Sequence, residues 1–410
     1  MKSVSNQTKK LVFSNPALTK LSSAHRVLLL QGPIGSFFKR LTELLEKNNK
    51  KTYKINFSGG DVVDYKSKNS IEFTGRIEEW PAFYRDKLSE LKIDMVILFG
   101  QSRPYHKYAV EIANFLGIDI IVLEEGYFRP GFFTMELGGV NSNSDTLNSY
   151  ELAADSVIPE AFNTGGSFHA FIRLGWLASK HYLMINLLRW KFPSYVHHKS
   201  ILIIPQFTYW IISFSKKLIR YSKDYRTVNE LAKGSYFFVP LQFDLDSQIK
   251  VHSDFVDNCE FIRHVLTSFV ANAPAGHKLV FKLHPMSRGS GNQEAFLADL
   301  VAKLAISKDR VIFLVEGRAG TLVSNAKAVV TINSTVGLLA LQHGVPLCVT
   351  GSAIYSNFSG VFKDRLDEFW TNCDSLKDQS VDNELKSLKS LTQMPGDLYA
   401  WASVPLEWVI

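Results

Sequence analysis

The amino-acid sequence predicts an α/β protein built from two Rossmann-like halves. Short, continuously apolar runs alternate with helical patterns in one block of the chain, up to about residue 140, and again in a second block from residue 236. Such runs are typical of parallel strands that are buried on both faces. A chain of 410 residues is also long enough for two domains, which usually have roughly 100–200 residues each.

The first block begins with an apolar run at 26–31, which a glycine-proline turn separates from a helical pattern at 36–47. Further strands are predicted at 52–57, 94–99 and 119–123, and helices at 82–91 and 105–116. Because strands and helices alternate, we expect a doubly wound parallel sheet. The pattern ends after about Val140, where a basic, aromatic segment begins.

The second block repeats the alternation. Strands are predicted at 236–241, 278–283, 310–314, 327–332 and 346–349, and helices at 252–271, 293–306 and 335–343. Two such halves with a long connection are typical of a GT-B-like fold, in which two Rossmann-like domains face a central cleft. Periplasmic-type binding proteins and epimerases share this plan, so it does not identify a function. We expect four segments: an N-terminal domain at 1–160, a basic aromatic helical insert at 161–235, a second domain at 236–385, and a C-terminal segment at 386–410 that packs back on the first domain.

The composition is that of a folded protein, with 46% hydrophobic and 21% charged residues. The three cysteines, Cys259, Cys348 and Cys373, lie far apart, which argues against a zinc site or a disulfide framework and for a reducing compartment. The start of the chain has no apolar stretch of the kind that a secretory signal needs. No window has the roughly 18 apolar residues of a membrane-spanning helix. The sequence therefore predicts a cytoplasmic protein.

The net charge of +7 is unevenly distributed. The segment 161–235 holds eleven Lys and Arg residues against two acids, a formal charge of +9, while the rest of the chain sums to −2. No nucleic-acid-binding motif accompanies this patch, so we expect no nucleic-acid partner. Basic residues interleaved with bulky apolar ones suit an anionic membrane surface. The alternative is a solvated basic face beside an ordinary helical subdomain.

Two amphipathic pieces of this segment, 171–190 and 209–220, are candidates for membrane contact. The aromatic residues expected at the level of the lipid headgroups are Trp176, Trp190, Tyr209 and Trp210. The cations expected to meet anionic lipid are Lys216, Lys217, Arg220, Lys223 and Arg226.

Polar clusters follow the predicted strands at their carboxyl ends, where open α/β sheets bind ligands. After the first strand, Gly32 and Gly35 would let a ligand approach backbone N–H groups, although a tight strand-to-helix turn explains the same glycines. The segment lacks the GxGxxG pattern, so we expect no nicotinamide cofactor. After the strand at 119–123, Glu124 and Glu125 suit general acid-base chemistry, with a solvated acidic pair as the alternative.

The first strand of the second block leads into Gln242, Asp244 and Asp246. The two aspartates are separated by one residue, and we expect only one of them to point readily toward a ligand. A helix N-cap is the alternative role, because Asp is favoured there.

Two further clusters of the second block favour an anionic ligand. Lys282, His284 and Arg288 follow a strand together with two glycines, which suits a phosphate or a carboxylate. The segment 333–337 (NSTVG) lies between a strand and a helix, where hydroxyl and N–H groups bind anions, although ordinary capping explains it equally well. Acids on one wall of a cleft and phosphate-binding groups on the other indicate sugar transfer from a nucleotide donor without a metal.

Motifs in order along about 27–370 resemble those of the KpsS/LipB type of capsular polysaccharide proteins. They are LLLQGPIGSFF, KINFSGGD, FGQSRPYH, EEGYFRP, the Gly139-Val140-Asn141 step, FVPLQFDLDSQI, KLHPMSRG, TINSTVG and Phe369-Trp370. The resemblance implies a retaining β-Kdo glycosyltransferase that acts at the inner face of the inner membrane. It implies CMP-Kdo as donor, a phosphatidylglycerol-type lipid as acceptor and a poly-Kdo linker for capsule assembly and export as product.

The same resemblance implies an acceptor side in the first domain, a CMP-sugar site in the second, and other capsule assembly or export proteins as partners. We expect no cofactor. Two other functions stay open. One is a transferase for another CMP-sugar of the sialic acid type, and the other is a non-catalytic factor in capsule export or assembly.

By analogy with related retaining β-Kdo transferases, Asp246 would be the nucleophile, with Asp244 as the alternative. Glu124 or Glu125 would deprotonate the lipid hydroxyl, and His284 would lie near the donor phosphate. The other residues expected to bind the donor are Lys282, Pro285, Arg288, Asn333, Ser334, Thr335, Gln242 and Arg129. Those expected in the acceptor or cleft loops are Gly32, Gly35, Asn56, Asp61, Gln101 and Arg103.

Overall fold

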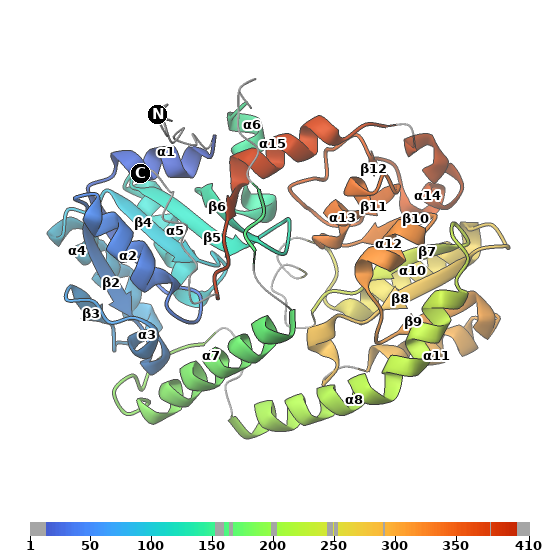
Figure 1. The fold of residues 1–410 in the computed structure, drawn as a ribbon, viewed down its shortest axis with the longest axis horizontal. Coiled ribbons are helices and arrows are strands. Elements are labelled where there is room, and N and C mark those ends of the chain that lie inside the picture. The colour runs from blue at the N-terminus through green and yellow to red at the C-terminus, as the bar shows by residue number, and fades with distance from the viewer. Residues whose placement is uncertain are drawn as a thin grey trace, which may run out of the picture. The chain divides into compact units, whose positions relative to one another are not determined.

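A computed structural model describes residues 14–151, 160–163, 167–197, 203–243, 249, 253–289, 292–377 and 379–399, with the side chains of 167–171 and 203–211 outside the description. The chain divides into two compact units (Figure 1). Unit 1 comprises Met1–Ser200 and Lys386–Ile410, and unit 2 comprises Ile201–Leu385.

Unit 1 is built on a seven-stranded sheet with the order β13-β6-β5-β4-β1-β2-β3. Its parallel strands are β1 (Arg26–Leu29), β2 (Lys51–Asn56), β3 (Ser70–Glu72), β4 (Met95–Phe99) and β5 (Asp119–Glu125). Strand β6 (Phe132–Leu137) runs antiparallel to β5, and β13 (Gln393–Pro395) runs antiparallel to β6. The strands that the sequence predicts in this block are confirmed as β1, β2, β4 and β5.

Successive residues of the central strands enter different cores, which explains why these strands are continuously apolar. On β1, Val27 and Leu29 belong to one core, and Leu28 belongs to the other. The first core is closed by α1 (Pro16–Ser23) and α2 (Phe37–Lys47). The second is closed by α4 (Trp80–Glu90) and α5 (Pro104–Phe115). The sheet is therefore covered by helices on both faces.

Two glycines allow close packing between α3 (Gly59–Asp64) and α7 (Ser167–Leu187) in unit 1. A Cβ atom at Gly59 would lie 2.1 Å from the carbonyl oxygen of Met184, and one at Gly60 would lie 2.5 Å from Cε1 of His181. Nδ1 of His181 also lies 2.7 Å from Oδ2 of Asp64. The glycines of the KINFSGGD motif thus serve helix packing. The remaining helices that reach unit 1 are α6 (Thr146–Ser149) and α15 (Asp382–Thr392), which leads into β13.

Unit 2 contains a six-stranded, fully parallel sheet with the order β12-β11-β10-β7-β8-β9. Its strands are β7 (Tyr236–Pro240), β8 (Lys278–Lys282), β9 (Val311–Leu314), β10 (Ala328–Thr331), β11 (Leu347–Val349) and β12 (Val361–Phe362). If β7 is counted as strand 1 and the sheet is followed from β9 to β12, the order is 3-2-1-4-5-6, which is that of a Rossmann fold. The strands β3-β2-β1-β4-β5-β6 of unit 1 have the same order. The predicted class of two Rossmann-like α/β halves is confirmed.

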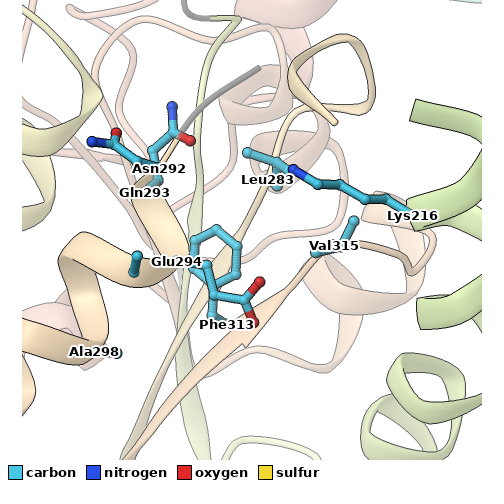
Figure 2. Close-up of a pocket in the computed structure, with 9 residues that line it drawn as sticks. Lys216, Leu283, Asn292, Gln293, Glu294, Ala298, Phe313 and Val315 are labelled. Carbon is cyan, nitrogen blue, oxygen red and sulfur yellow. The ribbon is translucent and has the colours of Figure 1, made fainter. Parts of the chain in front are cut away.

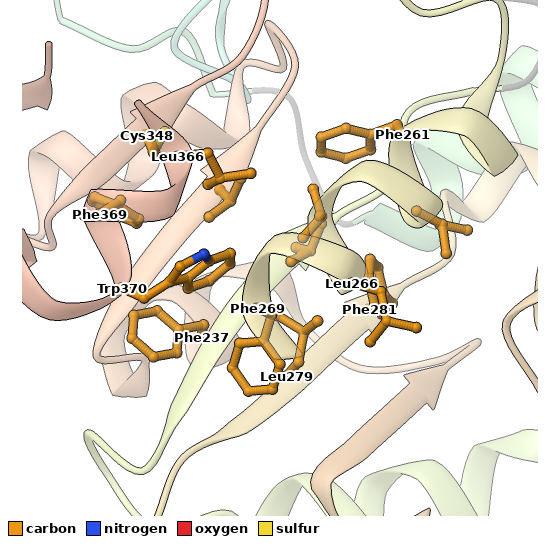
Figure 3. Close-up of a cluster of buried hydrophobic side chains, with 14 of the residues drawn as sticks. Phe237, Phe261, Leu266, Phe269, Leu279, Phe281, Cys348, Leu366, Phe369 and Trp370 are labelled. Atoms are coloured by element: carbon orange, nitrogen blue, oxygen red, sulfur yellow. The ribbon is translucent and has the colours of Figure 1, made fainter. Parts of the chain in front are cut away.

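The core of unit 2 is rich in aromatic residues (Figure 3). The ring of Trp370 packs against Phe237 and Phe269 at centroid distances of 4.9 and 5.3 Å, and its Nε1 donates a hydrogen bond of 2.8 Å to Oγ of Ser268. The Phe369-Trp370 motif is therefore structural. The helices of this unit are α8 (Ile203–Glu230), α10 (Asn258–Asn272), α11 (Gln293–Lys303), α12 (Ala319–Asn325), α13 (Val336–Gln342) and α14 (Leu366–Asn372).

The segment 161–235, which the sequence treats as one insert, contributes to both units. Helix α7 belongs to unit 1, and α8 belongs to unit 2. Oδ2 of Asp224, on α8, accepts hydrogen bonds of 2.9 Å from the N–H groups of Val315 and Glu316, at the end of β9. The division between the units thus falls near residue 200 and not at either end of the segment. Within the described ranges, no helix is both long and apolar enough to cross a membrane.

Candidate active site

In a doubly wound sheet, the ligand crevice opens where the strand order reverses. In unit 2 this switch point lies between β7 and β10, which are neighbours in the sheet. Nε2 of Gln242, just after β7, donates a hydrogen bond of 2.8 Å to Oδ1 of Asn333, just after β10. The N–H of Asn333 donates one of 3.4 Å to Oε1 of Gln242. The structure therefore brings these two predicted residues together at the switch point.

The predicted nucleophile, Asp246, follows Gln242 by four residues in the sequence. Asp244 and Asp246 lie outside the described residues, which resume with Ile249.

His284 follows β8, the strand beside β7. Its Nδ1 accepts a hydrogen bond of 3.1 Å from the N–H of Met286, in a short 3₁₀ turn that begins at Pro285. In the neutral imidazole the proton is therefore on Nε2, which makes Nε2 a donor. The ring is half-buried and lies 6.0 Å from the ring of Phe243, the residue after Gln242.

The two cations of this loop are held within the protein, which differs from the expectation that they contact the donor. Lys282 is 6% exposed, and its Nζ donates to the carbonyl oxygens of Leu283 (2.7 Å) and Val315 (3.0 Å). Burial lowers the pKa of Lys282 to about 8, although Glu316 opposes this shift. Arg288 forms a two-pronged ion pair with Glu316, with Nη2 at 3.1 Å from Oε2.

Ser334 and Thr335 precede α13, as the sequence predicts. Oγ of Ser334 accepts a hydrogen bond of 3.3 Å from the N–H of Val336, and its carbonyl accepts one from Oη of Tyr355. A Cβ atom at Gly337 would lie 2.5 Å from the same Oη, so the glycine makes room for Tyr355. These contacts support the capping alternative for this motif.

An apolar pocket of about 400 Å³ lies near the ends of β8 and β9 in unit 2 (Figure 2). Leu283, Phe313 and Val315 form its apolar wall. Lys216 from α8 and Glu294 from α11 add charged groups to its lining.

In unit 1 the switch point lies between β1 and β4. His106, on α5, joins the two loops, because its Nε2 accepts a hydrogen bond of 3.2 Å from the N–H of Gln31 and its Nδ1 lies 2.8 Å from the carbonyl oxygen of Gly100. Burial lowers the pKa of His106 to about 3, and nearby Arg103 adds to this shift. The ring is therefore neutral, with Nδ1–H as donor. The sequence predictions missed this residue, although it closes the FGQSRPYH motif.

The predicted loop residues around this point have packing roles as well. Nη1 of Arg103 donates a hydrogen bond of 3.2 Å to the carbonyl oxygen of Gly32. A Cβ atom at Gly32 would lie 2.6 Å from the ring of Phe38, and Gly35 has a φ of +103°, which disfavours other residues. The turn alternative for these glycines is thus supported.

Asn56 and Asp61 lie beneath the loop after β1, not on its surface. Asn56 is fully buried, with Oδ1 accepting a hydrogen bond of 2.5 Å from Nζ of Lys54. Asp61 is 3% exposed and accepts from Nε2 of Gln31 at 3.3 Å. Burial opposes the ionisation of Asp61, yet the charges of Lys54 and His181 hold its pKa below the usual range. The sequence placed these two residues in the acceptor or cleft loops, and in the structure both are buried and hydrogen-bonded within the protein.

The acidic pair lies at the carboxyl end of β5, beside β4. Glu124 and Glu125 are consecutive on the strand, so their side chains point to opposite faces. Oε2 of Glu124 lies over Gly100, 3.6 Å from the position a Cβ atom would take there, and Nε of Arg103 lies 3.4 Å from that position. Glu124 therefore faces the switch point.

Glu125 is bonded on the other side. Its Oε1 accepts a hydrogen bond of 3.1 Å from Oη of Tyr399, and Arg129 forms an ion pair with its Oε2. Arg129, expected among the donor-binding residues, thus lies in unit 1 and is paired with an acid. Tyr399 was not predicted from the sequence, apart from the expectation that the C-terminal segment packs on the first domain.

The loop after the acidic pair is fixed by Glu136 on β6. Oε1 of Glu136 accepts a hydrogen bond of 2.7 Å from Oη of Tyr127, which itself accepts one of 2.6 Å from the N–H of Asn141. Oε1 of Gln101 accepts one of 3.2 Å from the N–H of Val140. Burial raises the pKa of Glu136 to about 7, while its hydrogen bonds oppose the shift. The Gly139-Val140-Asn141 step thus anchors this loop.

Within the described residues, His, Cys, Asp and Glu side chains form no group of three or more that could hold a metal ion. The unit 1 switch point carries amide, imidazole and carboxylate groups, and the described residues of the unit 2 switch point carry an amide pair with an imidazole beside it. The chemistry of these groups is hydrogen bonding and proton transfer.

A family model described as "Capsule polysaccharide biosynthesis protein" matches residues 94–399. The chain is 31% identical over 407 residues to the capsule polysaccharide modification protein LipB of Neisseria meningitidis serogroup A, with 97% of each chain covered. It is 35% identical over 362 residues to the capsule polysaccharide export protein KpsS of Escherichia coli, covering 86% of this chain and 92% of that protein.

Among solved structures, KpsC of Thermosulfurimonas dismutans, a beta Kdo 2,7 transferase, matches with a TM-score of 0.44 and 13% identity, over 93% of this chain and 96% of that chain. A likeness at this level supports no conclusion about function. The family model and the two relatives confirm the resemblance seen in the motifs. The chain belongs to the capsule polysaccharide biosynthesis protein family.

Proposed function

We propose that this protein is a retaining β-Kdo glycosyltransferase that transfers Kdo from CMP-Kdo to a phosphatidylglycerol-type lipid and so begins the linker for capsule assembly. The observation that supports this most is the placement of polar groups at both switch points. Glu124 and Arg103 gather at that of unit 1, and Gln242, Asn333 and His284 gather at or beside that of unit 2. A sugar transferase needs a proton acceptor for its acceptor hydroxyl and a hydrogen-bonding site for its leaving phosphate.

On the donor side, we assign the phosphate to His284. Nδ1 accepts a hydrogen bond from the N–H of Met286, so the proton of the neutral imidazole is on Nε2. A donor held in this way stabilises the charge that develops on a departing phosphate. Gln242 and Asn333 would contact the nucleotide or the sugar. Lys282 and Arg288 act indirectly in this proposal, because each is bonded to groups of the protein that shape the loop.

We assign the nucleophile to Asp246, with Asp244 as the alternative, because both follow Gln242 within four residues in the sequence. A carboxylate directly beneath the anomeric carbon would form a covalent sugar intermediate, and attack by the lipid hydroxyl would then restore the original configuration. Replacing each aspartate with alanine separates them. We expect Asp246→Ala to abolish transfer and preserve CMP binding, whereas loss in Asp244→Ala alone would reverse the assignment.

Of the two glutamates, we assign the general base to Glu124. Its carboxylate lies beside Gly100 and Arg103 at the switch point, whereas both oxygens of Glu125 are bonded to Tyr399 and Arg129. A general base must be within reach of the proton that it takes. Glu125 therefore has an anchoring role in this account.

A bilayer-embedded acceptor requires the enzyme to work at a membrane surface, and α7 carries an exposed apolar stripe that suits one. Ile172, Trp176, Leu183 and Leu187 are 53%, 53%, 49% and 58% exposed. Their spacing places them on one side of the helix, opposite the side that packs on α3. We propose that this stripe inserts at the headgroup level, on the cytoplasmic face of the inner membrane.

Helix α8 carries a second surface of this kind, in which exposed apolar residues alternate with cations. Its apolar members are Ile212, Phe214, Leu218, Ile219 and Tyr221, and its exposed cations are Lys217, Lys223 and Arg226. Arg220 does not belong to this surface, because it contacts Asp224, Glu294 and the carbonyl oxygen of Phe313. Its expected contact with lipid is therefore wrong. The side chains of Tyr209 and Trp210 lie outside the described residues.

The direct test is to incubate the purified protein with CMP-Kdo and a fluorescent phosphatidylglycerol, and to follow the mass of the lipid. A gain of one Kdo supports the proposal. A gain only with a CMP-activated sialic acid would indicate the other transferase. No gain with either donor, while CMP and the lipid both bind, would favour the non-catalytic export factor.

A further inference from the structure

The last described residues of the chain return to the acidic loop at 124–130. Strand β13 pairs with β6, with Gln393 opposite Thr134, and β6 pairs with β5, with Thr134 opposite Glu124. The C-terminal strand is therefore separated from the strand of the acidic pair by a single strand. This registry brings the side chains after β13 to the end of β5 that carries the two glutamates.

Gln393 fixes the backbone of the acidic loop. Its side chain is fully buried, and Oε1 accepts hydrogen bonds from the N–H groups of Tyr127 (2.8 Å) and Phe128 (3.4 Å). Its Nε2 donates to Oγ1 of Thr134 and Oγ1 of Thr392, both at 3.0 Å. Both the oxygen and the nitrogen of this amide are thus hydrogen-bonded, and they hold the backbone directly after the acidic pair against β13.

Tyr399 reaches the acidic pair itself. Its Oη donates a hydrogen bond of 3.1 Å to Oε1 of Glu125. Burial raises the pKa of Tyr399 well above its usual value, and the charge of Glu125 adds to this. The phenol therefore remains protonated, and a hydrogen-bond donor, at neutral pH.

Tyr399 is in turn held by an ion pair that leads to α7. Oδ1 of Asp397 accepts a hydrogen bond of 2.8 Å from the N–H of Tyr399, and its Oδ2 lies 2.8 Å from Nη2 of Arg173. The side chains of Arg173 and Asp397 are only 16% and 13% exposed, so water screens this pair little. A chain of contacts thus runs from α7 through the C-terminal segment to Glu125.

We propose that Tyr399 is a positioning residue for the acidic pair, held in place by Asp397 and Arg173. The N–H of Glu125 donates to Oε1 of Glu124 at 3.3 Å, so fixing Glu125 also limits the orientations of Glu124. This inference rests on the proposed function, in which Glu124 accepts the proton of the lipid hydroxyl. It adds that the C-terminal segment completes the catalytic geometry of unit 1.

The test is a double-mutant cycle on the full-length protein, with Tyr399→Phe, Glu125→Ala and both together, in the transfer assay with CMP-Kdo and fluorescent phosphatidylglycerol. Tyr399→Phe removes one hydrogen bond to a carboxylate and keeps the ring. We expect kcat to fall about tenfold, with KM for CMP-Kdo unchanged within about twofold. With Glu125→Ala already present, Tyr399→Phe should add less than about twofold, because the two residues act as one contact.

Tyr84→Phe is the matched control. Tyr84 is fully buried in the same unit, and within the described part of the chain its Oη has no hydrogen-bond partner. Removing this hydroxyl should leave kcat and KM unchanged. Arg173→Lys should lower kcat in the same direction as Tyr399→Phe but by less, since an ammonium replaces only part of the guanidinium contact.

Two results would overturn the inference. The first is an unchanged kcat in Tyr399→Phe when Glu124→Gln is inactive. The second is a kcat of the double variant that falls by the product of the two single effects. Such a result would mean that Tyr399→Phe acts independently of Glu125, as a general loss of packing would. Failure of the proposed function has a different signature: either the wild-type protein transfers no Kdo or Glu124→Gln keeps full activity, and the inference then falls with it.

Discussion

The switch points of the two units are stabilised in different ways. In unit 1, a fully buried, neutral imidazole closes the gap between two loops, with His106 bonded to Gln31 on one side and Gly100 on the other. In unit 2, an amide pair, Gln242 and Asn333, takes the corresponding place, and the histidine stands beside it on a half-buried turn. A histidine in a loop motif is therefore a structural bridge in one unit and a candidate ligand-binding group in the other.

The charged side chains near the two switch points also differ between the units. The cations near the unit 2 switch point are paired within the protein, Lys282 with carbonyl oxygens and Arg288 with Glu316. In unit 1, a carboxylate, Glu124, and Arg103 both lie over Gly100. Among the described residues, the unit 1 switch point thus presents a carboxylate and a guanidinium, whereas the unit 2 switch point presents an amide pair with an imidazole beside it.

Among the variants that test this comparison, we expect the largest loss of transfer from changes in the acidic pair. Glu124→Gln should lower transfer by about a thousandfold, since general base catalysis typically contributes two to four orders of magnitude. Glu125→Gln should lower it only about tenfold, because that residue orients the loop. Initial rates of Kdo transfer measure both. A larger loss in Glu125→Gln than in Glu124→Gln would exchange the two roles.

The next effect concerns the two surface helices. Changing Lys217, Lys223 and Arg226 together to Glu should weaken binding to anionic liposomes about a hundredfold, at roughly 1 kcal/mol for each basic residue near the surface. Sedimentation with liposomes of phosphatidylglycerol measures the binding, and high salt should reduce it in the wild-type protein. Arg220 is left unchanged in this variant, because it contacts Asp224 and Glu294 and its replacement should destabilise the fold. If the triple variant bound as tightly as the wild-type protein, α8 would have no role at the membrane.

A third effect is a pH dependence of stability that resides in unit 1. The pKa of Glu136 is raised to about 7 in the folded protein, so the folded state holds this proton more tightly than the unfolded chain does. Its stabilising contribution is complete below about pH 4.5 and is lost as the pH rises through 7, a difference of about 3 kcal/mol. Urea unfolding of the wild-type protein and Glu136→Gln between pH 4.5 and 8 should show this loss in the wild-type protein alone. If the free energy of unfolding depended on pH in the same way in both proteins, this prediction would be contradicted.

The smallest effect compares the two histidines directly. His106→Leu should lower the free energy of unfolding by about 2 kcal/mol, because it leaves the N–H of Gln31 and the carbonyl of Gly100 buried without their partner. His284→Ala should change it by less than about 0.5 kcal/mol, because its site is on the surface of a turn. Denaturant titration measures both. Equal losses would mean that His284 is structural too.

The sequence predicted the central strands well and the edge strands poorly, for a physical reason. Strands β1, β4, β7 and β8 are buried on both faces, so each reads as an unbroken apolar run. Strand β13 has only three residues and is formed by pairing with β6. Nothing local in a short segment of this kind indicates a strand, because its hydrogen-bond partner is remote in the sequence.

For the candidate site, the sequence predicted residue types better than roles. Gln242, Asn333 and Glu124 lie at the switch points, as strand-end polar residues should. Asp61 resembles a site residue in the sequence but is part of a buried network, and Arg220 resembles a lipid-facing cation but is ion-paired. A sequence pattern gives the charge of a side chain, but which neighbours enclose it depends on the packing of distant segments.

The most direct test of the account is the affinity for CMP in two variants, one from each switch point. Calorimetric titration of CMP into Glu124→Gln should give the affinity of the wild-type protein, because the proposal assigns the acceptor, and not the donor, to unit 1. The same titration into His284→Ala should show an affinity at least about tenfold weaker, because the hydrogen bond to the phosphate is lost. Weakened CMP binding in Glu124→Gln together with unchanged binding in His284→Ala would contradict the proposed assignment of the donor to unit 2 and of the acceptor to unit 1.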